Sequence, residues 1–334
     1  MTTVLVTGSS GFVGRPLVTA LVERGDQVVA LDVSPPPSGL GPSVRALQGD
    51  LRDRATLTKA CTGVDTVIHV ASRVQTRGHD AEEVFAINVD GTRTLLSVCR
   101  EQGVKRFVYV SSASVVYDGK DIEGGDERLP YPHSFHAPYA ETKAIAEREI
   151  LAQNGRDGLL TCSIRPHVIF GPGDTRFFPA VAGRARDGKL KAYVGDATKL
   201  SDFTYVDNLV DALLLAADAL QPGSAVAGQA YFVTNGEPVA FWEFVGRLLD
   251  GLGYPRPRFK VPYPIAYSAA AVRERLDALR GIPTAEQSLT RFAIRYLTTH
   301  HYFSHAKATR DFGYKPKVDI SEGIRRTIAA MNPS

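Results

Sequence analysis

Hydrophobic runs and amphipathic stretches alternate along the first half of the chain. The runs are short and rich in β-branched residues, and they read TVLVTG, QVVALDV, VRALQGD, TVIHVAS, RFVYVSS and TCSIRPHVIFG. The stretches between them, at 14–23, 54–61, 82–102 and 139–153, repeat their apolar positions with the period of a helix. Strands that alternate with helices form parallel βαβ units, whose helices cover both faces of one sheet. Because such crossovers are right-handed, the pattern predicts an α/β fold with a doubly wound parallel sheet.

The alternation weakens after about Gly171, where proline, glycine, arginine and aromatic residues become frequent. Two later segments, FTYVDNLVDALLLAADAL and QAYFVTNG, regain the helix and strand patterns and are expected to return to the main sheet. We therefore expect a sheet domain of residues 1–165 plus about 203–235. Residues of about 166–202 and 236–334 are expected to form a smaller, mostly C-terminal lobe.

The composition is that of an ordinary globular protein, since 44% of the 334 residues are hydrophobic and 22% are charged. Basic and acidic residues are interspersed and give a formal net charge of +3, a pattern that predicts no nucleic-acid partner. The longest apolar stretches fall short of the ~20 residues of a membrane span, and we expect no transmembrane segment. Three cysteines without CxxC spacing fit a reducing compartment, and a strand starting at Thr2 or Thr3 leaves no room for a signal peptide. These features predict a cytoplasmic protein.

A glycine-rich turn follows the first predicted strand. In VLVTGSSGFVG, Gly8, Gly11 and Gly14 are spaced as GxxGxxG, and the segment opens the first predicted helix. Glycines at such a turn let the backbone approach a pyrophosphate, whose charge is stabilised by the free N–H groups of the helix N-terminus. The first gap is one residue longer than in GxGxxG, but strand, turn and helix occur in the order that a dinucleotide site needs. The three glycines, with Phe12 and Val13 between them, are therefore candidate dinucleotide-binding residues.

Asp32 ends the second predicted strand, 24 residues after Gly8. A carboxylate at this position accepts hydrogen bonds from the diol of an adenosine ribose and repels a 2′-phosphate. No arginine follows at position 33 or 34 to bind such a phosphate, although Arg15 stands just beyond the last glycine. The sequence therefore favours NAD over NADP as the cofactor.

Tyr139 and Lys143 are four residues apart in APYAETKAIAERE, so they lie on one face of the predicted helix. A phenol has a reference pKa of about 10, which is too high for ready proton exchange at neutral pH. A nearby ammonium favours the phenolate, and lowering the pKa by about three units corresponds to roughly 4 kcal/mol. The pair is therefore a candidate acid–base site.

Six motifs occur together in one order along the chain. They are GxxGxxG at 8–14, GDLRD at 49–53, HVAS at 69–72, NVDGT at 88–92, YVSSASVVY at 109–117 and YAETK at 139–143. No single motif is specific, but in this order and at these intervals they resemble the extended short-chain dehydrogenase/reductase superfamily. The resemblance covers essentially the whole chain. It implies a Rossmann sheet that binds the dinucleotide and a substrate site between this sheet and the C-terminal lobe.

The resemblance also implies catalytic roles. Tyr139 would act as general acid/base on the substrate oxygen, while Lys143 would lower its pKa and hydrogen-bond the nicotinamide ribose. Ser112 would hydrogen-bond the substrate oxygen, with Ser111 as the weaker alternative, and Ser114 would face the same region.

Further contacts to the dinucleotide follow from the same resemblance. It assigns Asp50 and Leu51 to the adenine, Val70, Ala71 and Ser72 to the path toward the nicotinamide, Asn88 to support beside the cofactor, and Pro166 and Val168 to the nicotinamide face. A polar residue at a helix start explains Asn88 equally well. The resemblance further implies a homodimer packed through the helices at about 82–102 and 139–153.

Three segments place the chain within the superfamily. LLTCSIRPHVIFGPGDTRFF (159–178), GQAYFVTNGEPV (228–239) and GYKPKVDISEGIRRTI (313–328) are most similar to 3β-hydroxysteroid dehydrogenases and sterol-4-carboxylate 3-dehydrogenases. Enzymes of this branch oxidise a secondary alcohol by hydride transfer to the nicotinamide. Bacterial reductases of long-chain 3-keto acids belong to the same branch. We therefore expect a 3β-hydroxysteroid, a sterol or a similar hydroxy-lipid as the substrate.

Two alternatives stay open. A nucleotide-sugar 4-epimerase or dehydratase would use the same three residues, but many such enzymes have asparagine where this chain has Val168, and dehydratases carry acidic residues where Ala113 and Ser114 stand. A non-catalytic dinucleotide-sensing protein would typically lack the tyrosine and lysine that this chain retains. The sequence also leaves open the direction of the reaction and whether oxidation is followed by decarboxylation.

The C-terminal lobe is rich in aromatic residues, most of which we expect in its core and some along an apolar pocket. They are Phe177, Phe178, Trp242, Tyr263, Tyr267, Phe292, Tyr296, Tyr302 and Phe303. Residues 264–279 have an amphipathic pattern that packing explains best, with a lid or a membrane-surface contact as alternatives. His300, His301 and His305 are close in sequence, but no cysteine, aspartate or glutamate nearby completes a zinc site, and we expect no metal.

Overall fold

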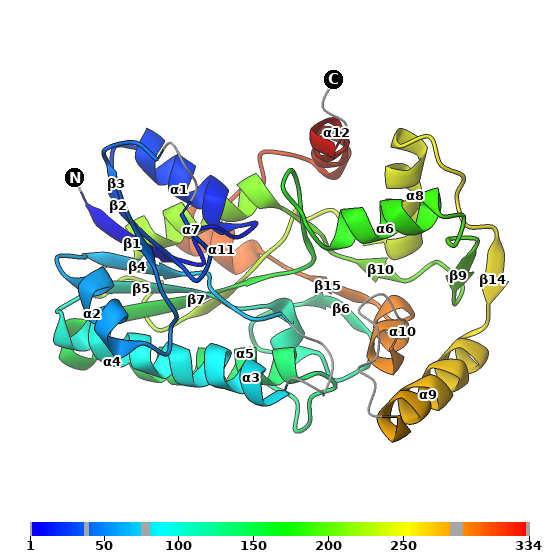
Figure 1. Cartoon of the computed structure of the whole chain (residues 1–334), viewed down its shortest axis with the longest axis horizontal. Helices are drawn as coiled ribbons and strands as arrows, with labels where there is room; N and C mark the ends of the chain where they lie inside the picture. Colours follow the sequence, from blue (N-terminus) through cyan, green and yellow to red (C-terminus); the bar gives the residue numbers. More distant parts are fainter. Residues whose placement is uncertain (1, 37–39, 75–80, 281–289, 332–334) are drawn as a thin grey trace.

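The computed structural model describes residues 2–36, 40–74, 81–280 and 290–331, and its centre is a parallel sheet of seven strands (Figure 1). In spatial order the strands are β12 (Ala230–Val233), β7 (Leu160–Pro166), β5 (Arg106–Val110), β4 (Thr66–His69), β1 (Thr3–Thr7), β2 (Gln27–Asp32) and β3 (Val44–Gln48). All neighbouring strands are parallel, and the strand order reverses between β1 and β4. The predicted doubly wound sheet is confirmed.

The central strand β1 explains why the strand segments read as continuous hydrophobic runs. Val4 pairs with Val28 of β2 on one side and with Thr66 of β4 on the other. Four consecutive residues of β1 are buried, so both faces of the strand are covered. A strand covered on both faces needs apolar side chains on both, which removes the polar alternation.

Helices cover both faces of the sheet (Figure 1). One face packs against α1 (Gly14–Glu23), α7 (Val206–Ala219) and α11 (Ala306–Phe312), and the other against α2 (Arg54–Cys61), α4 (Thr92–Glu101) and α5 (Pro138–Ala152). The helices at 14–23 and 54–61 therefore occur where the sequence predicted them. Residues of α11 were expected in the lobe, but Ala308 and Phe312 belong to the core of the main sheet.

The helix predicted at 82–102 is interrupted. It consists of α3 (Ala81–Phe85), a π-helical segment (Ala86–Gly91) and α4. Gly91 packs against Leu51, where an added Cβ would lie 2.8 Å from the Leu51 Cβ. The wider turn therefore lets the helix lie close to the loop that follows β3.

The smaller lobe combines segments that are far apart in sequence. Its helices are α6 (Phe177–Arg186), α8 (Phe241–Gly251), α9 (Tyr263–Leu279), α10 (Arg291–Leu297) and α12 (Ile320–Met331). Four short strands form a mixed sheet in the order β13 (Val239–Ala240), β10 (Leu200–Ser201), β15 (His301–Phe303) and β6 (Ile122–Gly125). Two further pairs are β11 (Thr204–Tyr205) with β8 (Ile169–Phe170), and β14 (Phe259–Val261) with β9 (Ala192–Val194). Residues 281–289 and 332–334 of the expected lobe lie outside the described residues.

Both segments that were expected to return to the main sheet do so. Residues 206–219 form α7, and residues 230–233 form β12, which pairs with β7 at the edge of the sheet. In the part of the chain that the structure describes, no helix is both long and apolar enough to span a bilayer.

Candidate active site

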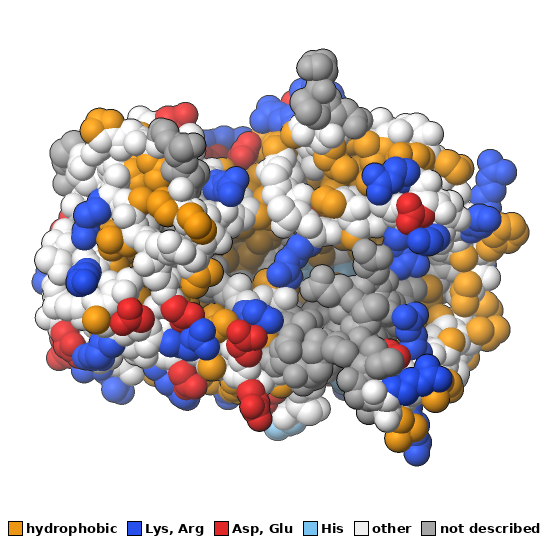
Figure 2. Space-filling model, viewed as in Figure 1, with side chains coloured by type: hydrophobic (Ala, Val, Ile, Leu, Met, Phe, Trp, Pro, Cys, Tyr) orange, Lys and Arg blue, Asp and Glu red, His pale blue; other side chains and the backbone are white. Residues whose placement is uncertain are grey.

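A cavity of about 760 Å³ lies along the carboxyl ends of the main-sheet strands. It extends from the glycine turn to Phe177, Phe292 and Tyr296 of the lobe. Its volume is within the ~300–1,000 Å³ that is usual for ligand sites, and it lies where strand order reverses, as ligand sites in open α/β sheets do. Figure 2 shows one face of the molecule hollowed near its middle, with hydrophobic side chains in the hollow.

Most of the residues predicted from the sequence meet in this cavity. Those that line it are Gly8, Gly11, Phe12, Val13, Asp32, Asp50, Leu51, Val70, Ala71, Ser72, Ser112, Tyr139, Lys143, Pro166 and Val168, together with Ser111 and Ser114. Gly14 and Asn88 were also predicted but lie behind the cavity wall. Three of the nine lobe aromatics, Phe177, Phe292 and Tyr296, line the cavity.

The glycine turn is packed too closely for side chains at two of its positions. Gly8 has a φ of +70°, and a Cβ at this position would lie 2.8 Å from the backbone of Ala71. A Cβ on Gly14 would lie 2.0 Å from the carbonyl oxygen of Gly8, because the turn folds back on the first turn of α1. The buried Ser10 Oγ has no hydrogen-bond partner among the described residues. This cradle at the N-terminus of α1 fits a dinucleotide phosphate.

Asp32 is held at the end of β2 by two backbone amides. Its Oδ2 accepts a hydrogen bond from the N–H of Ser10 (2.9 Å), and its Oδ1 accepts one from the N–H of Ser34 (2.8 Å). Each carboxylate oxygen has a further lone pair, so the fixed group can still accept hydrogen bonds from a ribose diol. Asp50, in contrast, pairs with Arg52 (2.6 Å), whose hydrogen bond holds the pKa of Asp50 below its usual range.

Asn88 supports the cavity from behind. Its Oδ1 accepts hydrogen bonds from the N–H of Arg73 (2.8 Å) and from Ser72 Oγ (3.2 Å), while its Nδ2 donates to the carbonyl oxygen of Arg73 (3.0 Å) and to Thr142 Oγ1 (3.1 Å). The side chain therefore fixes the loop after β4 against α5. This geometry makes Asn88 a positioning residue.

Ser112, Tyr139 and Lys143 come together at the centre of the cavity. α5 begins at Pro138, directly after an extended residue, so Tyr139 lies in its first turn. Ser112 Oγ lies 2.9 Å from Ser114 Oγ, and both serines line the cavity together with Tyr139. Lys143 is 2% exposed, and its ammonium donates to the carbonyl oxygen of Val110.

The pKa values differ from the sequence-based expectation. Burial raises the pKa of Tyr139 to about 12, against which the nearby Ser112 side chain and the charge of Arg176 act to lower it. Burial lowers the pKa of Lys143 to about 7, while the negative charge of Glu147 acts to raise it. That Lys143 lowers the pKa of Tyr139 stays a prediction, since in this structure the ammonium is directed at the carbonyl oxygen of Val110.

A buried network lies one helical turn beyond Lys143. Glu147 accepts hydrogen bonds from Arg165 (2.7 Å), Ser163 Oγ (2.6 Å) and the hydroxyl of Tyr131 (2.7 Å). Arg165 and Glu147 are 4% and 0% exposed, respectively. The network ties α5 to β7 and so fixes the helix that carries Tyr139 and Lys143. Sequence reasoning missed this network, although the spacing of Glu147 from Lys143 was visible.

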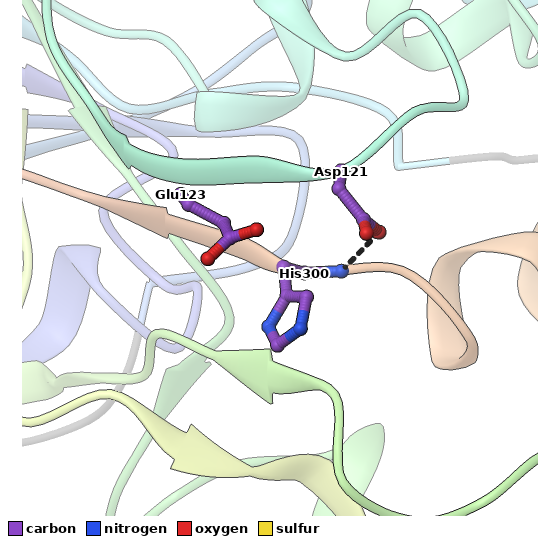
Figure 3. Close-up of side chains that lie close together, drawn as sticks. All are labelled: Asp121, Glu123 and His300. Carbon is purple, nitrogen blue, oxygen red and sulfur yellow. Dashed lines mark hydrogen bonds between the residues drawn. The ribbon is translucent and has the colours of Figure 1, made fainter.

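The three histidines do not converge on a metal site. Instead, Asp121 and Glu123 lie beside His300, with potential ligand atoms within 4.8 Å of one another (Figure 3). The local sequence around His300 does not reveal this grouping, because β6 meets β15 only in the folded protein. Lys199 donates to Asp121 (2.8 Å), and the N–H of Leu200 donates to His300 Nδ1 (3.1 Å). Protein groups therefore already partner two of the three side chains.

The doubly wound sheet, the glycine turn and the shared lining by Ser112, Tyr139 and Lys143 define an extended short-chain dehydrogenase/reductase. Residues 5–263 match the model of the 3-beta hydroxysteroid dehydrogenase/isomerase family, and the chain belongs to this family. Membership makes the protein an NAD-dependent dehydrogenase.

Relatives of known name cover almost the whole chain. The protein is 43% identical over 329 residues to a 2-alkyl-3-oxoalkanoate reductase of Stenotrophomonas maltophilia (strain K279a), with 98% of each chain covered. It is 38% identical over 330 residues to the decarboxylating sterol-4-alpha-carboxylate 3-dehydrogenase of Mus musculus, with 98% of this chain and 90% of the relative covered. The solved epimerase Mth375 of Methanothermobacter thermautotrophicus superimposes with a TM-score of 0.79 over 99% of this chain and 92% of its own, at 23% identity. This last likeness shows the fold alone.

Proposed function

We propose that the protein interconverts a secondary alcohol and a ketone on a 3β-hydroxysteroid, a sterol or a similar hydroxy-lipid, with NAD as the hydride carrier and Tyr139 as general acid/base. The observation that carries this proposal is that Ser112, Tyr139 and Lys143 line one cavity, which begins at the glycine turn. The two hydroxyl groups in this lining provide one oxygen to exchange a proton and another to orient the substrate. The names of the relatives, two of which act at the third carbon of a lipid-like molecule, support the substrate class.

The nicotinamide, when bound, supplies the acceptor for the hydride of the carbinol carbon. As the carbon–hydrogen bond breaks, Tyr139 takes the proton of the substrate hydroxyl and the carbon–oxygen double bond forms. Ser112 hydrogen-bonds the same oxygen and keeps it beside Tyr139. With the dinucleotide bound, Lys143 would hydrogen-bond the ribose and would favour the phenolate through its positive charge. In the reverse reaction Tyr139 returns the proton to the carbonyl oxygen.

The cavity wall favours a lipid over a nucleotide sugar. Apolar side chains of Phe12, Val168, Phe177 and Phe292 line it. These four side chains suit the rings or alkyl chains of a lipid and form no hydrogen bonds with sugar hydroxyls. A nucleotide-sugar 4-epimerase or dehydratase therefore remains the less favoured proposal, and a non-catalytic dinucleotide sensor is disfavoured because Ser112, Tyr139 and Lys143 are together.

Replacing the phenol tests the proposal. Tyr139→Phe is expected to keep its affinity for NADH and to lose about 10²- to 10⁴-fold in kcat, because the ring still packs but exchanges no proton. NADH fluorescence measures binding, and initial rates on a 3β-hydroxysteroid, a 3-hydroxy acid and a uridine diphosphate sugar measure turnover. Tyr254→Phe, whose ring lies outside the cavity lining, is the matched control. Full activity of Tyr139→Phe, or turnover of the sugar nucleotide alone, would contradict the proposal.

A further inference from the structure

Arg176 projects from a fixed point in the cavity wall. It lines the same cavity as Ser112 and Tyr139 and directly precedes α6. The carboxylate of Asp174 accepts hydrogen bonds from the backbone N–H groups of residues 176 (2.7 Å), 177 (3.1 Å) and 178 (2.8 Å). The backbone of Arg176 is therefore held by this cap, and the origin of its side chain is defined.

Most N–H donors of the Arg176 guanidinium group form no hydrogen bond within the described residues. Within the described residues it donates one hydrogen bond, from Nη1 to the carbonyl oxygen of Val74 (2.9 Å). A guanidinium carries five N–H donors in a planar fork that matches a carboxylate. Val74 follows Arg73, whose backbone Asn88 anchors, so the acceptor that positions the guanidinium is itself held in place.

Acidic side chains line one end of the cavity, and Arg176 lies toward the other end. Asp32 and Asp50 lie at the carboxyl ends of β2 and β3, at one edge of the sheet, and this is the end that we expect to bind the adenosine. Arg176 follows β8 on the other side of the sheet, toward Tyr139, and its charge contributes to lowering the pKa of that tyrosine. Asp174 adjoins it, but the Asp174 carboxylate already accepts three amide hydrogens. Among the described residues no ion pair joins Arg176 to a carboxylate, so its charge is available to a ligand in the cavity.

Resting on the proposed function, we propose that Arg176 binds a carboxylate carried by the carbon next to the reacting carbinol carbon. The preferred substrates are then β-hydroxy acids with a large apolar body, and the products are β-keto acids. Tyr139 and Ser112 hold the reacting oxygen, Arg176 holds the acid group, and the apolar wall accepts the remainder. Arg176 is thus a specificity-determining residue that discriminates acids from neutral alcohols.

The loop that carries Arg176 also approaches the glycine turn. A Cβ on Gly173 would lie 3.9 Å from the ring of Phe12. An arginine in this loop is therefore within the neighbourhood of the dinucleotide as well as that of the substrate. Binding of NADH has to be measured separately from turnover.

The test compares an acid with its ester. Initial rates of NADH formation are measured with 2-hexyl-3-hydroxydecanoate and with its methyl ester, for the wild type, Arg176→Gln, Arg176→Lys and Arg186→Gln. Arg186 lies on the same helix, 75% exposed, and provides the control. The ratio of kcat/KM for the acid to that for the ester is expected to fall about 10- to 100-fold in Arg176→Gln, the factor expected for a lost charged hydrogen bond. Arg176→Lys is expected to give an intermediate ratio, and NADH affinity is expected to be unchanged.

The outcomes separate this inference from the proposed function. An unchanged ratio overturns it, and so does a loss of NADH affinity that slows acid and ester equally, which assigns Arg176 to the cofactor. Oxidation of a neutral 3β-hydroxysteroid but of neither probe also overturns the inference and leaves the proposed function standing. Oxidation of none of the three compounds overturns both. If Arg176→Gln has a lowered melting temperature, the charge-retaining Arg176→Lys supplies the same comparison in a folded protein.

Discussion

Lys143 and Tyr139 hold the two protons that decide the state of the active site. Burial lowers the pKa of Lys143 to about 7 and raises that of Tyr139 to about 12, so the first proton leaves the pair near neutral pH. Since the pKa of Lys143 is the lower of the two, its ammonium is the first of these groups to lose a proton as the pH rises. The loss of this first proton, near neutral pH, therefore decides whether the site contains a group that can accept a proton.

The pH dependence of both reaction directions follows from this step. For alcohol oxidation the site must already have lost this proton, because it then has to accept the proton of the substrate hydroxyl. We expect kcat/KM for oxidation to rise with pH through about 7 and then to level off, and kcat/KM for ketone reduction to fall over the same range. Lys143→Met is expected to abolish this inflection. Rates measured from about pH 5 to about pH 9 provide the check, and an inflection that persists in Lys143→Met would contradict the assignment.

Asp32 is the residue on which the preference for NAD depends. Asp32→Asn keeps the shape and an acceptor oxygen for the N–H of Ser10, but it removes the charge that repels a 2′-phosphate. The ratio of kcat/KM with NAD to that with NADP is expected to fall about 10- to 100-fold. Asp218→Asn, which alters an exposed carboxylate on α7, is the control. A ratio that stays constant in Asp32→Asn would mean that another group excludes the phosphate.

The hydrophobic pattern located regular elements well and irregular ones poorly. The strands of the main sheet and the helices α1 and α2 occur where the period predicted them. The helix at 82–102 contains a π-helical segment, because a period of apolar residues does not tell an i→i−4 from an i→i−5 hydrogen bond. The strands of the four-stranded sheet were missed because two to four residues carry no measurable period.

The residues of the candidate site likewise fall into those that the sequence predicted and those that it did not. Motifs with fixed spacing predicted the glycine turn and the group of Ser112, Tyr139 and Lys143, all of which line one cavity apart from Gly14. Arg176 carries no motif, and its approach to this cavity depends on how α6 and the loop after β4 pack together. Tertiary contacts of this kind are absent from a local pattern.

The buried pair that joins α5 to β7 is expected to contribute strongly to stability. Glu147→Gln leaves the charge of Arg165 without a partner in the interior, and we expect a loss of about 3–5 kcal/mol in the free energy of unfolding. Glu149→Gln changes the same residue type on the same helix, but it breaks an exposed pair with Arg93 and is expected to cost less than about 1 kcal/mol. Urea unfolding followed by circular dichroism measures both. Equal losses in the two variants would show that the buried pair does not anchor the helix.

At the scale of the whole molecule, we propose that the protein is a homodimer that packs through α4 and α5. Light scattering is expected to give about twice the chain mass of 36.2 kDa. Arg93→Glu places a negative charge beside Glu149 and Asp90 on this face and is expected to shift the mass toward the monomer. Arg310→Glu makes the same change on α11, which covers the opposite face of the sheet, and is expected to leave the mass unchanged. A monomeric wild type would contradict the proposal.

The position of β12 has a consequence for the order in which the chain folds during synthesis. β7 ends at Pro166, but its outer neighbour is made from residues 230–233, so a ribosome has to translate part of the lobe before the sheet is complete. Until then the nascent chain presents β7 as an open edge that is buried along most of its length in the finished protein. The sheet is therefore completed only after part of the lobe has been synthesised, and the crevice between sheet and lobe forms at that stage.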